Sequence, residues 1–319
     1  MVSPEIHRPV KVAIIGSGNV GATFAYTLLL SGLATEIVLI DANQSRAEGE
    51  MMDLNHAVPL TQPARVIVGT YADLAGSVVV VITAGSAQKP GESRLDLVAR
   101  NANIFKSIIP EVVRHNPNGI LLIATNPVDV LSYIAWKISG LSSDRVIGSG
   151  TILDTARFRS LLSQYFGVDA RSVHAYIIGE HGDSEVPVWS LANIAGMRLP
   201  VYCAHNGREC HSQDLETIFH QVRDAAYEII QRKGSTYYAI AAGLLRITEA
   251  IIRDQGTVLT ISGYISNYYG IDDVYLSLPS IVDRGGLEHI IRLDLAEEEI
   301  KGLQNSAAVL KKITRELGY

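Results

Sequence analysis

Short runs of continuous apolar residues alternate with longer segments in the first half of the chain. These runs lack the apolar–polar alternation of a half-exposed strand, so they predict strands that are buried on both faces. We expect such strands at residues 10–15, 37–40, 65–69, 78–84 and 120–125. Apolar residues recur at helical spacing in residues 22–30, 95–114 and 128–139. Buried strands separated by helices predict an α/β fold, a Rossmann-type doubly wound parallel sheet with helices on both faces.

The second half of the chain has longer helical segments and fewer strands. Helices are expected at residues 151–166, 213–232, 235–253 and 295–317, and strands at 173–178, 257–265 and 273–282. The chain has 319 residues, and single hydrophobic cores stop growing at about 250–300 residues. We therefore expect two domains, a parallel-sheet domain at residues 1–149 and an α+β domain at residues 150–319.

Composition excludes several classes of function. A net charge of −6 without a basic block argues against nucleic acid as a partner. The apolar runs are far too short to span a membrane, and residues 1–10 lack the apolar core of a signal peptide. Cys203 and Cys210 are too few for a disulfide-stabilised scaffold, and their spacing with His205 and His211 matches no standard zinc site. The sequence predicts a soluble cytoplasmic protein that holds no metal.

A glycine-rich turn follows the first strand. It reads Gly16-Ser17-Gly18-Asn19-Val20-Gly21, and Asp41 ends the next strand twenty residues later. Glycines here permit a tight turn, a close backbone approach to a pyrophosphate and close packing of the helix on the strand. An acid at this distance holds the ribose hydroxyls and repels a 2′-phosphate. Strand, glycines, helix, strand and acid in this order predict a dinucleotide site that favours NAD over NADP.

The segments that leave the carboxyl ends of the next strands are the next candidate contacts. Ligands of such sheets bind outside these ends, which here are residues 83–86 and 125–127. The stretch from Gly85 to Arg94 is rich in glycine and proline with little apolar content. It is either a solvated connection or, because of its position at the binding edge, a lid that closes over the site.

Chemistry in the second half centres on His181, which follows an apolar strand in the sequence Gly-Glu-His-Gly-Asp. Histidine takes and returns a proton near neutral pH. Asp154 and Arg157 are three residues apart on a predicted helix and therefore share one face. The carboxylate can orient the imidazole, and the guanidinium can bind a substrate carboxylate with two parallel hydrogen bonds. The alternatives are an exposed turn histidine and a surface ion pair.

These features resemble the L-lactate dehydrogenases of the lactate/malate dehydrogenase family, in their bacterial form, from about Lys11 to Leu317. The resemblance rests on GSGNVG with Asp41, AQKPGESR, ATNPVDV, GSGTILDTARFR, HAYIIGEHGD and KGSTYY, which occur in this order. It implies oxidation of a 2-hydroxy acid, with hydride passing to NAD and the hydroxyl proton passing to a base. The NAD contacts that it implies are Gly16, Gly18, Val20, Gly21, Asp41, Arg46, Tyr71, Gly85, Ser86, Ser107, Ala124, Asn126 and Ser149.

The resemblance also implies roles for the substrate side. His181 would be the proton donor and acceptor, Asp154 would orient it, and Arg157 would bind the substrate carboxylate. Arg94 would polarise the carbonyl after the loop closes. The further substrate contacts that it implies are Gln88, Asn126 and Thr236.

Gln88 separates lactate from malate as the substrate. Malate dehydrogenases of this family carry an arginine there, whereas a neutral glutamine would leave a second carboxylate unpaired, at a cost of several kcal/mol. Pyruvate and L-lactate are therefore expected. Ser86-Ala87 differs from the Ala-Asn of many lactate dehydrogenases, which leaves a larger 2-oxo acid open. A malate dehydrogenase, a broader 2-hydroxyacid dehydrogenase and a non-catalytic dinucleotide sensor are the alternative functions.

Arg159 and His174 are not needed for this chemistry. Arg159 lies about 200° around the helix from Arg157, so it cannot serve the same pocket. Both residues match positions that bind fructose 1,6-bisphosphate across a subunit interface in allosteric bacterial members of the family, and such cations suit phosphate. The resemblance thus implies an effector site and a homotetramer of paired dimers; a surface cation and a strand-end histidine are the plainer interpretation.

Overall fold

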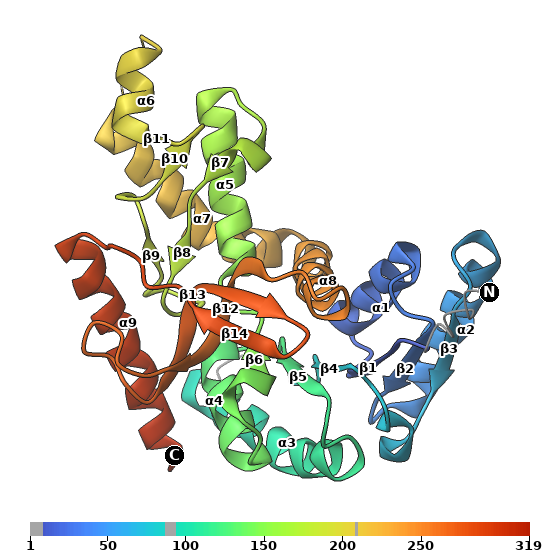
Figure 1. Ribbon diagram of the computed structural model, residues 1–319. Coiled ribbons are helices and arrows are strands. Elements are labelled where there is room, and N and C mark those ends of the chain that lie inside the picture. Colours follow the sequence, from blue (N-terminus) through green and yellow to red (C-terminus); the bar gives the residue numbers. More distant parts are fainter. Residues whose placement is uncertain (1–8, 87–93, 208–209) are drawn as a thin grey trace, which may run out of the picture.

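One nine-stranded sheet runs through the molecule (Figure 1). The computed structural model describes residues 9–86, 94–207 and 210–319. The strand order in this sheet is β14-β13-β12-β6-β5-β4-β1-β2-β3. The first-half strands form its parallel part, and the second-half strands extend it on one side.

The parallel part confirms the expected doubly wound sheet. Its strands are β1 (Lys11–Ile15), β2 (Glu36–Ile40), β3 (Arg65–Val68), β4 (Val79–Ile82), β5 (Ile120–Ile123) and β6 (Val146–Gly148), and every neighbouring pair among them is parallel. In β4, Val80 and Ile82 enter one hydrophobic core, whereas Val79 and Val81 enter another. A strand with a core on each face has no polar side, which explains its continuous apolar sequence.

Helices cover both faces of this sheet. Helices α1 and α8 lie together on one face, and α3, α4 and α9 lie on the other (Figure 1). Helix α8 belongs to the second half of the chain, so the two halves share a core through Phe24 and Leu244. The helices around the parallel part of the sheet are α1 (Asn19–Ser31), α2 (Gln44–Ala57), α3 (Arg94–His115), α4 (Val128–Ser139), α8 (Tyr238–Ile252) and α9 (Glu297–Glu316).

The second half adds antiparallel strands to the sheet. These are β12 (Thr257–Ile265), β13 (Val274–Asp283) and β14 (Gly286–Ile290). Strand β12 joins the parallel part where Ser262 pairs with Gly148 of β6. A Cβ atom on Gly148 would lie 2.9 Å from Cβ of Ser262. Only glycine therefore fits at this junction between the two halves.

The rest of the second half surrounds a third core that includes Phe158 and Val222. Its helices are α5 (Ile152–Phe166), α6 (Leu199–His205) and α7 (Ser212–Lys233). Its strands are β7 (Val173–His174), β8 (Ile177–Ile178), β9 (Val186–Pro187), β10 (Asn193–Ile194) and β11 (Met197–Arg198). Short 3-10 helices occur in both halves of the chain. They are η1 (Val58–Leu60), η2 (Tyr71–Leu74), η3 (Ser143–Arg145) and η4 (Ala170–Ser172).

Several local expectations are corrected. The single strand expected at residues 173–178 is two strands in two different small sheets. Cys203 and Cys210 are joined by a disulfide, which the sequence did not predict. Because this bond links the end of α6 to the residue pair before α7, it is a local closure and not a scaffold. Among the described residues, no helix is long and apolar enough to cross a membrane, and no cluster of His, Cys, Asp or Glu is arranged to hold a metal ion.

The glycine turn before α1 yields a first prediction. A Cβ atom on Gly21 would overlap the carbonyl oxygen of Gly16 and lie 2.8 Å from Oγ1 of Thr83. We expect Gly21→Ala to lower the free energy of unfolding by about 1–3 kcal/mol, measured by urea denaturation. Gly49→Ala in α2 is the control, because nothing lies within 4 Å of the added methyl group. Equal stability of the two variants would contradict the prediction.

Candidate active site

The turn after β8 carries His181 and is held from several directions. Gly179 and Ser277 of β13 exchange both backbone hydrogen bonds, at 2.8 and 2.9 Å. The backbone N–H of Glu180 donates to Oγ of Ser306 on α9 at 2.6 Å. The Glu180 carboxylate in turn accepts a hydrogen bond from the Ser184 hydroxyl at 2.6 Å. Contacts from two other elements thus fix a turn that would otherwise be an exposed loop.

Helix α5 is attached to the same strand and carries Asp154. The hydroxyl of Thr151 donates to the carbonyl oxygen of Ile177 at 2.6 Å, and the N–H of Ile177 donates to the Thr155 hydroxyl at 3.0 Å. These two threonines lie on either side of Asp154 in the first turn of the helix. As a result, Oδ2 of Asp154 lies 2.5 Å from Nδ1 of His181.

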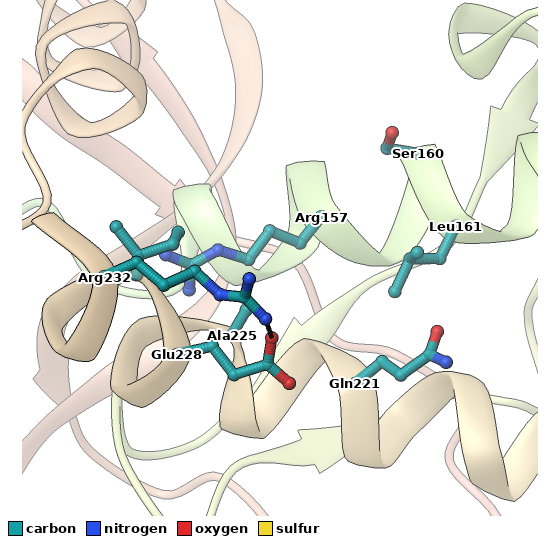
Figure 2. A pocket seen from close by; sticks show the side chains of 8 residues that line it. Arg157, Ser160, Leu161, Gln221, Ala225, Glu228 and Arg232 are labelled. Atoms are coloured by element: carbon teal, nitrogen blue, oxygen red, sulfur yellow. Dashed lines mark hydrogen bonds and ion pairs between the residues drawn. The ribbon is translucent and has the colours of Figure 1, made fainter.

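Arg157 completes this group from the next turn of α5. Its Nη1 donates to Oδ1 of Asp154 at 2.9 Å, and its side chain is 14% exposed. Arg157 lines a cavity of about 450 Å³. Figure 2 shows its side chain extending toward side chains of α7 that line the same cavity, among them Glu228 and Arg232. A guanidinium has five N–H groups, so pairing with Asp154 leaves donors for a second carboxylate.

The environment favours the charged imidazole. Burial acts to lower the pKa of His181, but the carboxylates of Asp154, Asp129 and Glu185 outweigh it and raise this pKa to about 9. Burial acts to raise the pKa of Asp154. The positive charges of His181 and Arg157 outweigh burial and hold the pKa of this carboxyl below its ordinary value. At neutral pH the imidazole therefore carries a proton on the nitrogen that faces away from Asp154, ready for transfer.

Two buried carboxyl groups near His181 were missed by the sequence reasoning. Asp129 accepts the backbone N–H of His181 at 2.8 Å and the Ser262 hydroxyl at 2.6 Å, and burial raises its pKa to about 6. Glu185 is 7% exposed, its Oε1 has no hydrogen-bond partner in the described part of the chain, and burial raises its pKa to about 8. The only sequence signal was their place within ATNPVDV and directly after the His181 turn.

A second cavity of about 610 Å³ lies at the carboxyl ends of the parallel strands. The carboxylate of Asp41 closes one side of it, where Oδ2 accepts the N–H of Ser17 at 2.6 Å. Arg46 donates to Oδ1 of Asn19 at 3.3 Å near the same side. The predicted cofactor residues that line this cavity are Gly16, Gly18, Asp41, Arg46, Tyr71, Gly85 and Ser107.

The other predicted cofactor residues lie around this cavity without lining it. The N–H of Ser86 donates to Oδ1 of Asn101 at 2.9 Å, and the carbonyl oxygen of Asn126 accepts from Nδ2 of the same residue at 3.0 Å. Ala124 directly follows β5 and Ser149 directly follows β6, whereas Val20 and Gly21 lie in the first turn of α1.

The cavity has the features that a dinucleotide requires. A Cβ atom on Gly16, whose φ is +104°, would lie 2.5 Å from the backbone nitrogen of Ala84, so only glycine fits at this bend. Gly18 has nothing within 4 Å of the same position, which leaves the backbone at the start of α1 open to a phosphate. With Asp41 at the far side, the cavity suits a pyrophosphate and a ribose that carries both hydroxyls.

Three predicted substrate contacts are less defined. Gln88 lies outside the described residues, and Arg94 begins α3 but its side chain is also outside them. Thr236 is half-buried in the segment after α7. The neighbouring Ser235 accepts a hydrogen bond from Asn19 in the glycine turn at 3.1 Å, so this segment lies beside the cofactor cavity.

Arg159 lies away from the His181 group. Its Nε donates to the carbonyl oxygen of Ala175 at 2.9 Å, and its guanidinium lies over the Tyr176 ring. It lines a third cavity of about 590 Å³, which Arg171 and Arg246 also line. His174 is exposed on β7, directly before Ala175. Arg157 and Arg159 thus line different cavities.

Comparison with known protein families agrees with this arrangement. Residues 10–148 match the model of the lactate/malate dehydrogenase NAD-binding domain, and residues 151–317 match the α/β C-terminal domain of the same family. An L-lactate dehydrogenase of Acetivibrio thermocellus is 53% identical over 311 residues, covering 96% of this chain and 97% of that protein. One of Thermoanaerobacter pseudethanolicus is 52% identical over 307 residues, covering 96% and 99%.

Solved structures give the same result. A lactate dehydrogenase from a Medee basin deep-sea metagenome library superposes with a TM-score of 0.94 at 46% identity, covering 98% of this chain and all of that one. The minor L-lactate dehydrogenase of Enterococcus mundtii, solved with bound ligands, also has a TM-score of 0.94, at 42% identity, covering 97% and 98%.

Proposed function

Because this chain belongs to the lactate/malate dehydrogenase family, we propose that it is an NAD-dependent L-lactate dehydrogenase. The reaction is the reversible transfer of a hydride between L-lactate and NAD⁺, with pyruvate and NADH as the other pair. The observation that carries the proposal is the 2.5 Å contact between His181 and Asp154, with Arg157 on the same carboxylate. The relatives that match nearly the whole chain are named L-lactate dehydrogenases, which supports the same substrate.

In this function His181 moves the proton. When pyruvate is reduced, Nε2 of the protonated ring donates to the carbonyl oxygen as that oxygen gains charge. Asp154 keeps the ring oriented through Nδ1 and offsets its positive charge. The nicotinamide supplies the hydride when NADH is bound. In the reverse direction, the neutral ring accepts the hydroxyl proton of lactate.

Arg157 binds the carboxylate that lactate and pyruvate share. A planar guanidinium grips a carboxylate with two parallel hydrogen bonds, which orients the substrate as well as holding it. Arg94 polarises the carbonyl, and Asn126 and Thr236 contribute further contacts on the substrate side. The family resemblance supports these three roles, together with a division of the chain at residues 1–149 and 150–319 and a cytoplasmic location.

NAD binds in the cavity at the carboxyl ends of the parallel strands. Gly16 and Gly18 admit the pyrophosphate, and Asp41 accepts hydrogen bonds from the adenosine ribose in place of Ser17. Ser86, Ala124, Asn126 and Ser149 would be further NAD contacts, a role that the family resemblance supports. A carboxylate at Asp41 repels a 2′-phosphate, so NADH is the expected cofactor over NADPH.

Substrate choice provides the test of this function. Oxidation of NADH by the wild-type protein is expected to be much faster with pyruvate than with oxaloacetate, because a neutral Gln88 leaves a second carboxylate unpaired. Gln88→Arg should raise the oxaloacetate-to-pyruvate ratio of kcat/KM at least about tenfold. Steady-state absorbance assays measure both ratios. Preference of the wild-type protein for oxaloacetate would indicate a malate dehydrogenase, and no oxidation with either acid would indicate a cofactor sensor.

Regulation by fructose 1,6-bisphosphate in a homotetramer is also part of the proposal. Arg159 and His174 would bind the phosphates, and this is supported by the hydrogen bond from Arg159 to Ala175, the residue after His174. The bisphosphate should lower the KM for pyruvate of the wild-type protein and leave that of Arg159→Gln unchanged. Arg253→Gln is the control, because Arg253 is not among the residues that line this cavity. An unaffected wild-type KM, or a monomer by sedimentation, would contradict the proposal.

A further inference from the structure

We propose that Ser235 is a positioning residue that couples the cofactor site to the substrate site. Its hydroxyl is held by Asn19 of the glycine turn, and this contact fixes the short segment that carries Thr236. The inference rests on the proposed function for the role of Thr236 as a substrate contact. The contacts that carry it are those of the chain itself.

The hydrogen bond between Asn19 and Ser235 joins the two halves of the chain. Asn19 is the first residue of α1, and Ser235 lies between α7 and α8. Nδ2 of Asn19 donates to Oγ of Ser235 at 3.1 Å, although the two residues are 216 positions apart. The neighbour of this bond on the cofactor side is Gly18, and its neighbour on the substrate side is Thr236. It therefore lies where the two sites of the proposed function come together.

Arg46 sets the orientation of the Asn19 amide. Arg46 lines the cofactor cavity beside Asp41, and its Nη2 donates to Oδ1 of Asn19 at 3.3 Å. A guanidinium can only donate hydrogen bonds, so it faces the amide oxygen and turns Nδ2 toward Ser235. Donation from a cation to Oδ1 also polarises the amide, which makes Nδ2 a stronger donor. A row of three polar side chains thus runs from the cofactor cavity to the substrate segment.

The segment that follows α7 is short and is held on both sides of Ser235. Helix α7 ends at Gly234, whose φ is +87°. Nζ of Lys233 lies 3.4 Å from the ring centroid of Tyr237 and 4.1 Å from that of Tyr238, with which α8 begins. Helix α8 packs in turn against α1 (Figure 1). Only residues 235–236 lie between Gly234 and Tyr237, so a shift of the first is passed directly to the second.

Ser235→Ala removes the acceptor of this hydrogen bond and leaves the backbone as it is. We expect the KM for pyruvate to rise about threefold, because an exposed neutral hydrogen bond contributes modestly. The kcat should not change, since His181 and Arg157 are untouched, and neither should the Kd of NADH in the absence of pyruvate. Steady-state absorbance assays and NADH fluorescence titration measure these constants. Ser235→Thr keeps the hydroxyl and should restore the wild-type KM.

Asn19→Ala removes the same bond from its other partner. It should raise the KM for pyruvate by the same factor, and the double variant should be no worse than either single one, because both changes remove one interaction. The Kd of NADH is measured separately for this variant, since Asn19 also accepts from Arg46. Thr217→Ala is the matched control: the Thr217 hydroxyl donates to the carbonyl oxygen of Gln213 within α7. It should leave the KM unchanged.

The outcomes separate the inference from the proposed function. An unchanged KM for pyruvate in Ser235→Ala, or single effects that multiply in the double variant, would overturn the positioning role and leave the dehydrogenase function standing. A wild-type protein that fails to oxidise NADH with pyruvate would reject the dehydrogenase function instead. In that case the same cycle is measured on the free energy of unfolding in urea. Non-additive losses would then support the link between the two halves, and additive losses would overturn it.

Discussion

The contact between Nδ1 of His181 and Oδ2 of Asp154 is the interaction on which the rest of the site depends. A carboxylate that is 4% exposed is costly to ionise unless a cation is near. Two cationic side chains, His181 and Arg157, hydrogen-bond to the Asp154 carboxylate. Removing Asp154 would take away the one carboxylate that both cations contact. Asp154 thus orients the imidazole of His181 and favours its charged form, and the charged imidazole in turn favours the ionised form of Asp154.

Much of the fold serves to bring these groups together. Thr151 and Thr155 attach α5 to β8, and Ser277 and Ser306 hold the turn that follows. The main sheet continues from the parallel strands into β12–β14, so the cofactor cavity and the His181 group are built on one framework. The glycine turn, in contrast, depends on the absence of side chains, because a side chain at Gly16 or Gly21 would collide with the neighbouring backbone.

Patterns of apolar residues predicted most of the parallel sheet because strands with a core on each face have a distinctive sequence. Elements without that signature were missed. Strand β6 has only three residues, α2 is a polar helix with just Ala47 and Leu54 buried, and β14 is an edge strand with exposed polar positions. Their formation depends on neighbours that local sequence does not reveal.

The same limit applies to the site. Asp154 and Arg157 were recognisable because helical spacing places them on one face, and the family motifs supplied their roles. Asp129 was not, because its partners His181 and Ser262 are 52 and 133 residues away in the chain. Glu185 and the disulfide between Cys203 and Cys210 depend likewise on burial and on packing that emerge only in the folded chain.

The decisive measurement is the pKa of His181, followed by NMR in the unliganded wild-type protein and in Asp154→Asn. We expect a pKa near 9 in the wild-type protein and a fall to about 6.5 or below in the variant, because burial then acts with less opposition. A wild-type pKa near 6.5, or a pKa that Asp154→Asn leaves unchanged, would show that Asp154 does not hold the imidazole in its charged form.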